Sequence, residues 1–208
     1  MIARMAGTMA ALRLLIGSGQ RSDGLTLVRS LYEHVVTLCW FMIDPERRLK
    51  RLFDHSLASQ RTLHKDAAPF GLTLLSEDEL EQSRGKSRLP KLPQLATEVD
   101  HYWGPRIRGF RAQPESGPKD ILTLSGMYVG LYRIASRSAH PTIEGLDPCV
   151  ESSAGRVFVR TESDEKPLPF GFALPLFAMA LLVCHQVLRW PRRRCRALFE
   201  RLAVLGRS

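Results

Sequence analysis

Between residues 25 and 43, apolar side chains recur every three or four positions. This spacing places them along one side of an α-helix, so the segment is predicted to form a long amphipathic helix. Asp44-Pro45 follows, and because proline suits the first turn of a helix, a second helix is expected over residues 45–66. We expect the two helices to form an antiparallel hairpin, with these apolar side chains of the second facing the core: Leu49, Leu52, Phe53 and Leu57.

Most of the remaining chain also has helical character. Helices are expected over residues 2–16, 92–103, 120–139, 169–190 and 192–205, and a capping box at Ser76 opens a short one. Residues 156–160 alone favour a strand, which allows a small β-hairpin insertion. The 208 residues are 44% hydrophobic and 25% charged, a composition that excludes a wholly disordered chain. The sequence therefore predicts an all-α bundle of long antiparallel helices, in a single domain over residues 1–208.

The cysteines give no sign of a metal site or a disulfide framework. Cys39, Cys149, Cys184 and Cys195 are too widely spaced for a zinc knuckle, so we expect no metal and no cofactor. Cys39 and Cys184 lie in apolar runs and are expected to be buried. A cytoplasmic location fits this pattern. Residues 167–184 carry no charge, but Gly171 and Pro175 interrupt the run, which favours a bundle helix over a membrane anchor.

The chain is strongly basic, with a formal charge of +9 and a pI near 9.9. Such a charge favours polyanionic partners, although an arginine-rich genome would produce the same balance. The C-terminal segment, residues 191–208, concentrates the basic side chains Arg192, Arg193, Arg194 and Arg196. These arginines suit contacts with nucleic-acid phosphates, and a solvated helix face is the alternative interpretation.

The predicted helix over residues 120–139 carries the best candidate for chemistry. Tyr132, Ser136 and His140 are spaced by four residues and share one face. Arg133 and His140 are two turns apart, about 10.5 Å along the axis, with Arg137 between them. Because an arginine side chain is long, one phosphate could contact both Arg133 and His140. The structural alternative is that His140 ends the helix while Tyr132 and Ser136 form hydrogen bonds in the core.

A second polar pair, Arg29 and Glu33, lies one helical turn apart on the strongly apolar helix over residues 25–43. A solvated ion pair at this spacing contributes only about 0.3–0.5 kcal/mol. Glu33 is expected to be partly buried, however, and would then need a partner such as Arg29, Tyr132 or Arg133. The pair is therefore interpreted either as a structural network or as support for the candidate site.

Taken together, these motifs resemble a bacterial family of unknown function. The family carries an Arg-x-x-x-Glu helix and a Tyr-x-x-x-Ser-x-x-x-His helix, which match Arg29-Ser30-Leu31-Tyr32-Glu33 and the Tyr132, Ser136, His140-Pro141 set, with Asp44-Pro45-Glu46-Arg47 between them. The resemblance covers roughly residues 10–190. It implies a HEPN-like helical bundle, a fold shared with prokaryotic toxin and defence ribonucleases.

In the wider HEPN group four to six residues separate an arginine from a histidine, and Arg133-x6-His140 is similar to the long form of that pattern. The chain departs from it at Ile134, where a polar residue is common. The resemblance implies a metal-independent endoribonuclease in which His140 moves a proton and Arg133 holds the phosphate. It also implies a homodimer acting on RNA as a toxin or phage-defence effector, with a protein partner or antitoxin. The alternative is a non-catalytic helical module that binds protein or nucleic acid.

Overall fold

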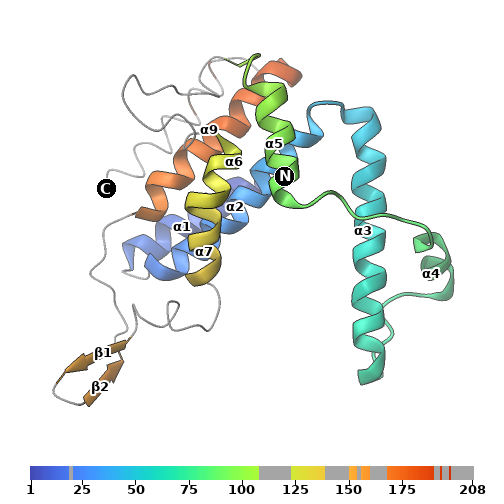
Figure 1. The fold of residues 1–208 in the computed structure, drawn as a ribbon, viewed down its shortest axis with the longest axis horizontal. Coiled ribbons are helices and arrows are strands. Elements are labelled where there is room, and N and C mark those ends of the chain that lie inside the picture. Colours follow the sequence, from blue (N-terminus) through green and yellow to red (C-terminus); the bar gives the residue numbers. More distant parts are fainter. Residues whose placement is uncertain are drawn as a thin grey trace.

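The computed structural model describes residues 1–18, 21–107, 123–138, 150–153, 156–159 and 168–189, together with 193 and 197. Figure 1 shows a bundle of helices from which one long helix projects to the side. The helices are α1 (Ile2–Gly17), α2 (Arg21–Phe41), α3 (Pro45–Ala67), α4 (Glu77–Ser83), α5 (Leu92–Trp103), α6 (Leu124–Met127), α7 (Arg133–Ser138) and α9 (Leu168–Leu188), with a 3-10 turn η1 (Ala68–Phe70) and a π-helical turn η2 (Tyr128–Tyr132). The predicted all-α bundle is confirmed.

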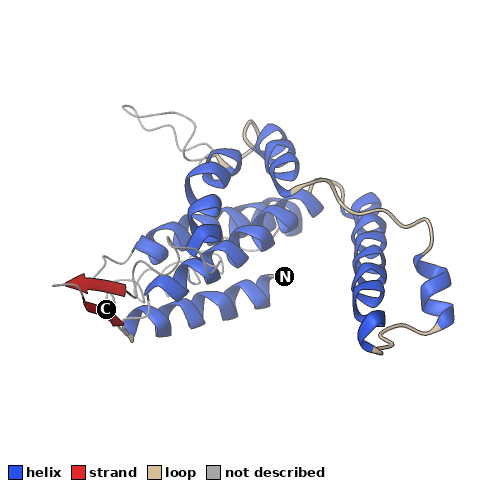
Figure 2. Cartoon of the chain, turned by 60° about the horizontal axis from the view of Figure 1, so that its bottom comes forward, coloured by secondary structure: helices blue, strands red, loops and turns tan. Residues whose placement is uncertain are grey.

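Helix α2 forms the centre of the bundle. It packs against α1, α5, α7 and α9, and these neighbours cover most of its circumference. Its buried apolar side chains accordingly extend beyond one stripe and include Val28, Leu31, Val35, Val36, Cys39 and Trp40. Helices α1 and α2 are joined by a short connection and run antiparallel, as Figure 2 shows. Burial of apolar surface around most of α2 is the main stabilising contribution to this part of the molecule.

The antiparallel hairpin expected between α2 and α3 was a wrong prediction. Helix α3 turns away from α2 at Asp44 and projects from the bundle (Figure 1). Two side chains expected to face the core are exposed, Leu49 at 47% and Phe53 at 63%, while Leu52 and Leu57 are only partly buried. The other faces of α2 are already covered by α1, α5, α7 and α9, so little of its surface remains to receive α3.

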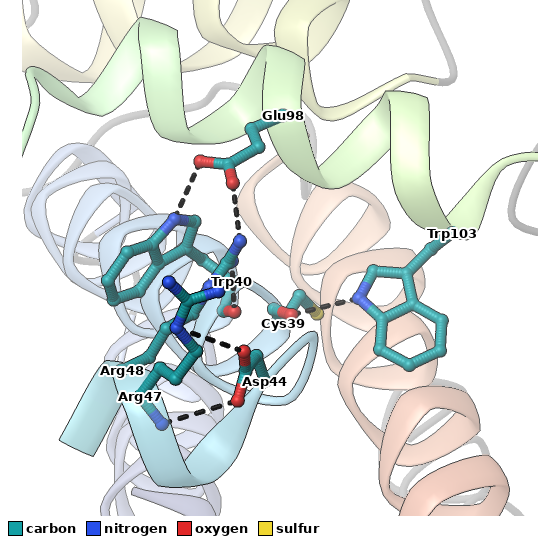
Figure 3. A network of polar contacts seen from close by, with 7 residues as sticks. All are labelled: Cys39, Trp40, Asp44, Arg47, Arg48, Glu98 and Trp103. Atoms are coloured by element: carbon teal, nitrogen blue, oxygen red, sulfur yellow. Dashed lines mark hydrogen bonds and ion pairs between the residues drawn. The ribbon is translucent and has the colours of Figure 1, made fainter.

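A polar corner fixes the direction in which α3 leaves the bundle (Figure 3). The Arg48 guanidinium donates to the Trp40 carbonyl at 2.6 Å and to the Glu98 carboxylate, and its carbon lies 4.5 Å from the Trp40 ring centroid. The Trp40 indole donates to the same carboxylate at 2.7 Å. Asp44 caps α3 by accepting the Arg47 N–H at 3.2 Å. These contacts join α2, α3 and α5, and none of the long-range ones was predicted from the sequence.

Helix α3 and the chain that returns along it form a unit that we call the limb, residues 45–91. The polar contacts that connect the returning chain to α3 include Lys86 to Asp54 at 3.0 Å, Arg61 to the Ser83 carbonyl at 3.0 Å, and Arg88 to the Thr62 hydroxyl at 2.8 Å. The predicted capping box is confirmed, because Ser76 Oγ accepts the Glu79 N–H at 3.3 Å and Glu79 accepts the Ser76 N–H at 2.8 Å. That hydrogen bonding lowers the pKa of Glu79.

The helix expected over residues 120–139 is formed by α6, η2 and α7 in succession. Asp100 of α5 caps its start, accepting the N–H groups of Leu124 at 2.9 Å and Ser125 at 2.8 Å. A buried carboxylate at a helix N-terminus satisfies donors that have no partner within the helix. The expected start at residue 120 and the expected end at His140-Pro141 both lie outside the described residues.

Helix α9 packs along α2, as expected for a bundle helix, and buries Leu176, Phe177, Ala180 and Cys184. It is also long and apolar enough to cross a membrane: Gly171–Leu188 has a mean hydropathy of 1.9, and 44% of this stretch is buried inside the molecule. Two short strands, β1 (Val150–Ser153) and β2 (Arg156–Val159), pair antiparallel with Val150 opposite Val159. The β-hairpin that the sequence allowed is thus present.

Candidate functional site

The candidate site lies where η2 and α7 pack against α2, two elements about a hundred residues apart in the sequence (Figure 1). The Tyr132 hydroxyl donates to Glu33 Oε1 at 2.8 Å, and Arg29 Nε lies 3.4 Å from the same oxygen. The Arg29 guanidinium carbon is 5.3 Å from the Tyr132 ring centroid. The partners expected for Glu33 therefore include the two that it contacts, Arg29 and Tyr132. We call Arg29, Glu33 and Tyr132 the site triad.

The site triad lies at the edge of the bundle. The Arg29 and Glu33 side chains are 31% and 43% exposed, so solvent reaches the ion pair. Desolvation raises the pKa of Tyr132, and its hydrogen bond to Glu33 raises the pKa further, against the opposing effect of Arg29. Interaction with Tyr132 raises the pKa of Arg29, with a smaller contribution from Glu33. The triad thus combines a guanidinium, a carboxylate and a phenol.

Two further tyrosines extend the site triad into an aromatic cluster. Tyr128 stacks on Tyr132 with ring centroids 5.0 Å apart and an angle of 17° between the ring planes. The ring centroid of Tyr32 lies 5.5 Å from that of Tyr132, and the Tyr32 hydroxyl donates a hydrogen bond to the Leu124 carbonyl at 2.5 Å. Burial raises the pKa of Tyr32 well above its ordinary value. Tyr128 and Tyr32 were not predicted as site residues, although the spacing of four between Tyr128 and Tyr132 was a visible signal.

The π-helical turn coincides with this cluster, since η2 begins at Tyr128 and ends at Tyr132. π-Helical turns are uncommon and occur frequently at functional sites. No sequence pattern predicted one here. The turn is followed directly by Arg133, the first residue of α7, whose side chain is exposed.

The remaining predicted residues of this region are placed only in part. The Ser136 hydroxyl oxygen is buried and has no hydrogen-bond partner among the described residues. Tyr132 thus forms a partly buried hydrogen bond, to Glu33, whereas Ser136 forms none with the described residues. The Arg137 side chain and the whole of His140 lie outside the described residues. The pairing of Arg133 with His140 consequently stays a prediction.

The basic C-terminal segment lies almost wholly beyond what the structure describes. Arg193 is exposed, whereas Arg192, Arg194 and Arg196 are outside the described residues. Their expected contacts with nucleic acid stay predictions.

Metal-ligating side chains are not gathered within the described part of the chain, where no group of three or more His, Cys, Asp or Glu residues could hold an ion. Cys39 and Cys184 are buried, as expected. Burial raises the pKa of the Cys39 thiol far above its ordinary value, so this side chain is a poor nucleophile. The chemistry available at the candidate site is that of a guanidinium, a carboxylate and phenols.

Comparison with known proteins identifies the family. The model of a family of unknown function, DUF5677, matches residues 1–156 of the 208, and the chain belongs to this family. The match includes α1 to α7 and thus both elements that form the site triad. No curated protein and no solved structure matches the chain.

Proposed function

We propose that the protein is a metal-independent endoribonuclease of the HEPN type. The function of its family is unknown, so the proposal rests on the site itself. One observation carries the proposal. An exposed arginine, Arg133, follows a π-helical turn that the Glu33–Tyr132 hydrogen bond connects to α2. A guanidinium in this position is accessible to a phosphodiester and is held on a packed scaffold.

In the proposed reaction, Arg133 binds the scissile phosphate and stabilises the charge that develops on its oxygens. His140 acts as the general base on the ribose 2′-hydroxyl or as the acid toward the leaving oxygen. The 2′-oxygen attacks the adjacent phosphorus, and the bond from phosphorus to the 5′-oxygen breaks. The products carry a 2′,3′-cyclic phosphate and a 5′-hydroxyl.

The site triad has a positioning role in this proposal. The hydrogen bond from Tyr132 to Glu33 connects the residue before Arg133 to the centre of the bundle. Arg29 supplies a second cation, 31% exposed, on the same side of α2 as Glu33. Ser136 and Arg137 continue the helix toward His140 and complete the set of supporting residues.

The wider biological assignment follows from the same proposal. The protein acts as a cytoplasmic toxin or phage-defence effector and functions as a homodimer. A protein partner or antitoxin restrains it. The basic tail, with Arg192, Arg193, Arg194 and Arg196, binds the RNA backbone.

The proposal is tested by incubating the purified full chain with a structured RNA in EDTA. We expect wild type to cleave the RNA and His140→Ala to lose at least a hundredfold in rate, as is usual for loss of a general base. His101→Ala is the matched control, because His101 is an exposed histidine on α5. If wild type and His140→Ala leave the RNA equally intact with any required partner present, the enzymatic proposal is wrong.

A non-catalytic module that binds protein or nucleic acid is the second candidate. Two observations favour it. Glu33 Oε1 contacts both Tyr132 and Arg29, an arrangement that also suits a purely structural role. In addition, Ile134 follows Arg133 at a position where a polar residue is common. This candidate predicts that RNA binding persists in His140→Ala and weakens when the four tail arginines are replaced by alanine. Unchanged affinity in the tail variant would count against nucleic-acid binding by this segment.

A further inference from the structure

Two histidines of α3 bind the backbone of the chain that returns along the limb. His64 Nδ1 accepts the N–H groups of Leu74 at 3.2 Å and Leu75 at 3.1 Å. His55 Nδ1 accepts the N–H of Leu89 at 3.2 Å. These three contacts bracket α4, because Leu74 and Leu75 precede it and Leu89 follows it.

Each of these contacts requires a neutral imidazole. A nitrogen that accepts an N–H group must carry a free lone pair, so the ring proton of His55 and of His64 resides on Nε2. Protonation at Nδ1 turns the acceptor into a donor and places two N–H groups against each other. His34 provides an internal contrast, since its Nδ1 lies 2.6 Å from the Ser30 carbonyl oxygen and therefore donates. Protonation leaves that contact intact.

The charged surroundings favour the neutral state of His55. Burial lowers the pKa of His55, and the positive charge of Arg88 lowers it further. Asp54 adjoins His55 in the sequence but is paired with Lys86 at 3.0 Å. The charged groups nearest His64 in the sequence are Lys65 and Asp66 on α3, while α4 begins with the acidic residues Glu77, Asp78 and Glu79.

Few apolar contacts support the returning chain. Among the residues of the limb, the buried side chains are Ala58, Leu75 and Ser83. The other side-chain contacts with α3 are the ion pair and hydrogen bonds of Lys86, Arg61 and Arg88, and Leu89 also packs against the core of the bundle. Loss of three backbone hydrogen bonds is therefore a large fraction of what holds this segment on α3.

We propose that His55 and His64 form a proton-sensitive clasp that holds residues 71–91 on α3 at neutral pH and releases them in mildly acidic conditions. The clasp is independent of the proposed ribonuclease activity, because no residue of the limb belongs to the site triad. Its ligand is the proton, and its output is exposure of the α3 surface beneath α4.

The direction of the pH effect follows from linkage. Residues 71–91 attach to α3 only when the histidines are neutral. The stability of this attachment is therefore fully present above the ordinary histidine pKa of about 6.5 and is lost as the pH falls below it. For His55, whose pKa is lowered in the attached state, protonation of the free imidazole favours release by at most about thirtyfold at pH 5.0. Release in acid, with the bundle intact, distinguishes the clasp from general acid unfolding.

Hydrogen exchange of the full chain, followed by mass spectrometry at pH 7.5 and 5.0 and corrected for the intrinsic pH dependence, tests the clasp. We expect protection of peptides from residues 71–91 to fall at least tenfold at pH 5.0, while α1 and α2 keep theirs. The double variant His55→Asn/His64→Asn should lose this response, because the asparagine oxygen accepts an N–H group and does not titrate. His101→Asn is the control and should respond as wild type does.

Equal protection of residues 71–91 at the two pH values in wild type overturns the proposal. So does a double variant that responds to pH as strongly as wild type. A measurement that needs no variant is the ¹⁵N chemical shift of the imidazole nitrogens at pH 7.5. The clasp requires a proton on Nε2 and none on Nδ1 in both His55 and His64, and the opposite tautomer in either residue contradicts it.

Discussion

The bundle and the limb are built from the same kind of helix but are stabilised in different ways. In the bundle, α2 is surrounded by four helices and its apolar side chains are buried on several sides. In the limb, α3 leaves Leu49, Phe53 and Leu63 exposed, and polar contacts attach the returning chain. The comparison indicates that the candidate site rests on the densely packed part of the molecule, whereas the segment proposed to respond to pH, residues 71–91, lies in the limb.

The largest expected effect comes from equivalent substitutions in the two regions. Phe177→Ala in α9 removes a side chain that is 1% exposed, and the resulting cavity should lower the free energy of unfolding by about 3–5 kcal/mol. Phe53→Ala in α3 removes one that is 63% exposed and should change it by less than about 0.5 kcal/mol. Urea denaturation measures both. Equal losses would mean that the face of α3 carrying Phe53 is packed in solution.

The second largest effect on stability is expected from substitutions at the junction between the bundle and the limb. Arg48 is 12% exposed and bonds both the Trp40 carbonyl and Glu98 (Figure 3), so Arg48→Ala should destabilise the protein by about 2 kcal/mol. Its neighbour Arg47 is 88% exposed and lies 4.0 Å from Asp44, so Arg47→Ala should cost less than about 0.5 kcal/mol. Thermal and urea unfolding of the two variants would show whether this corner connects the regions as described. Indistinguishable variants would contradict it.

The smallest effect is local to the limb. Ser76→Ala removes the N-cap of α4 and should weaken that helix by about 1 kcal/mol, which is about fivefold in hydrogen-exchange protection. Protection of α2 should not change, because α4 contacts α3 and lies apart from the bundle. Ser56→Ala, at an exposed position of α3, is the control and should leave α4 as it is. A loss of protection that spreads to α2 would show that limb and bundle unfold together.

Local signals in the sequence predicted the helices well. Proline after Asp44 marked the start of α3 and the capping box at Ser76 marked α4, and the helix expected over residues 92–103 has the bounds of α5, Leu92–Trp103. The packing of α3 could not be predicted in the same way. Periodicity shows which side chains share a face of a helix, whereas burial of that face depends on whether a partner helix has surface left to receive it.

The candidate site could likewise be predicted only where signals local in the sequence were sufficient. Glu33 on an apolar helix needs a partner, and this requirement pointed to Arg29 and Tyr132, which the structure places beside it. The capping of α6 by Asp100 was missed because it depends on a contact between segments distant in the sequence, and the π-helical turn was missed because no sequence pattern marked it. His55 and His64 were missed as well, since acceptance of a backbone N–H group leaves no trace in residue spacing.

The central claim is that an accessible guanidinium at the start of α7, held by the bundle, binds the reacting phosphate. Its most direct test is the rate of RNA cleavage in EDTA by Arg133→Ala compared with Arg13→Ala, a variant at an exposed arginine of α1. Loss of an electrostatic contact to the transition state predicts a rate about 10²–10³ lower for Arg133→Ala and an unchanged rate for Arg13→Ala. Equal rates for the two variants would contradict the claim.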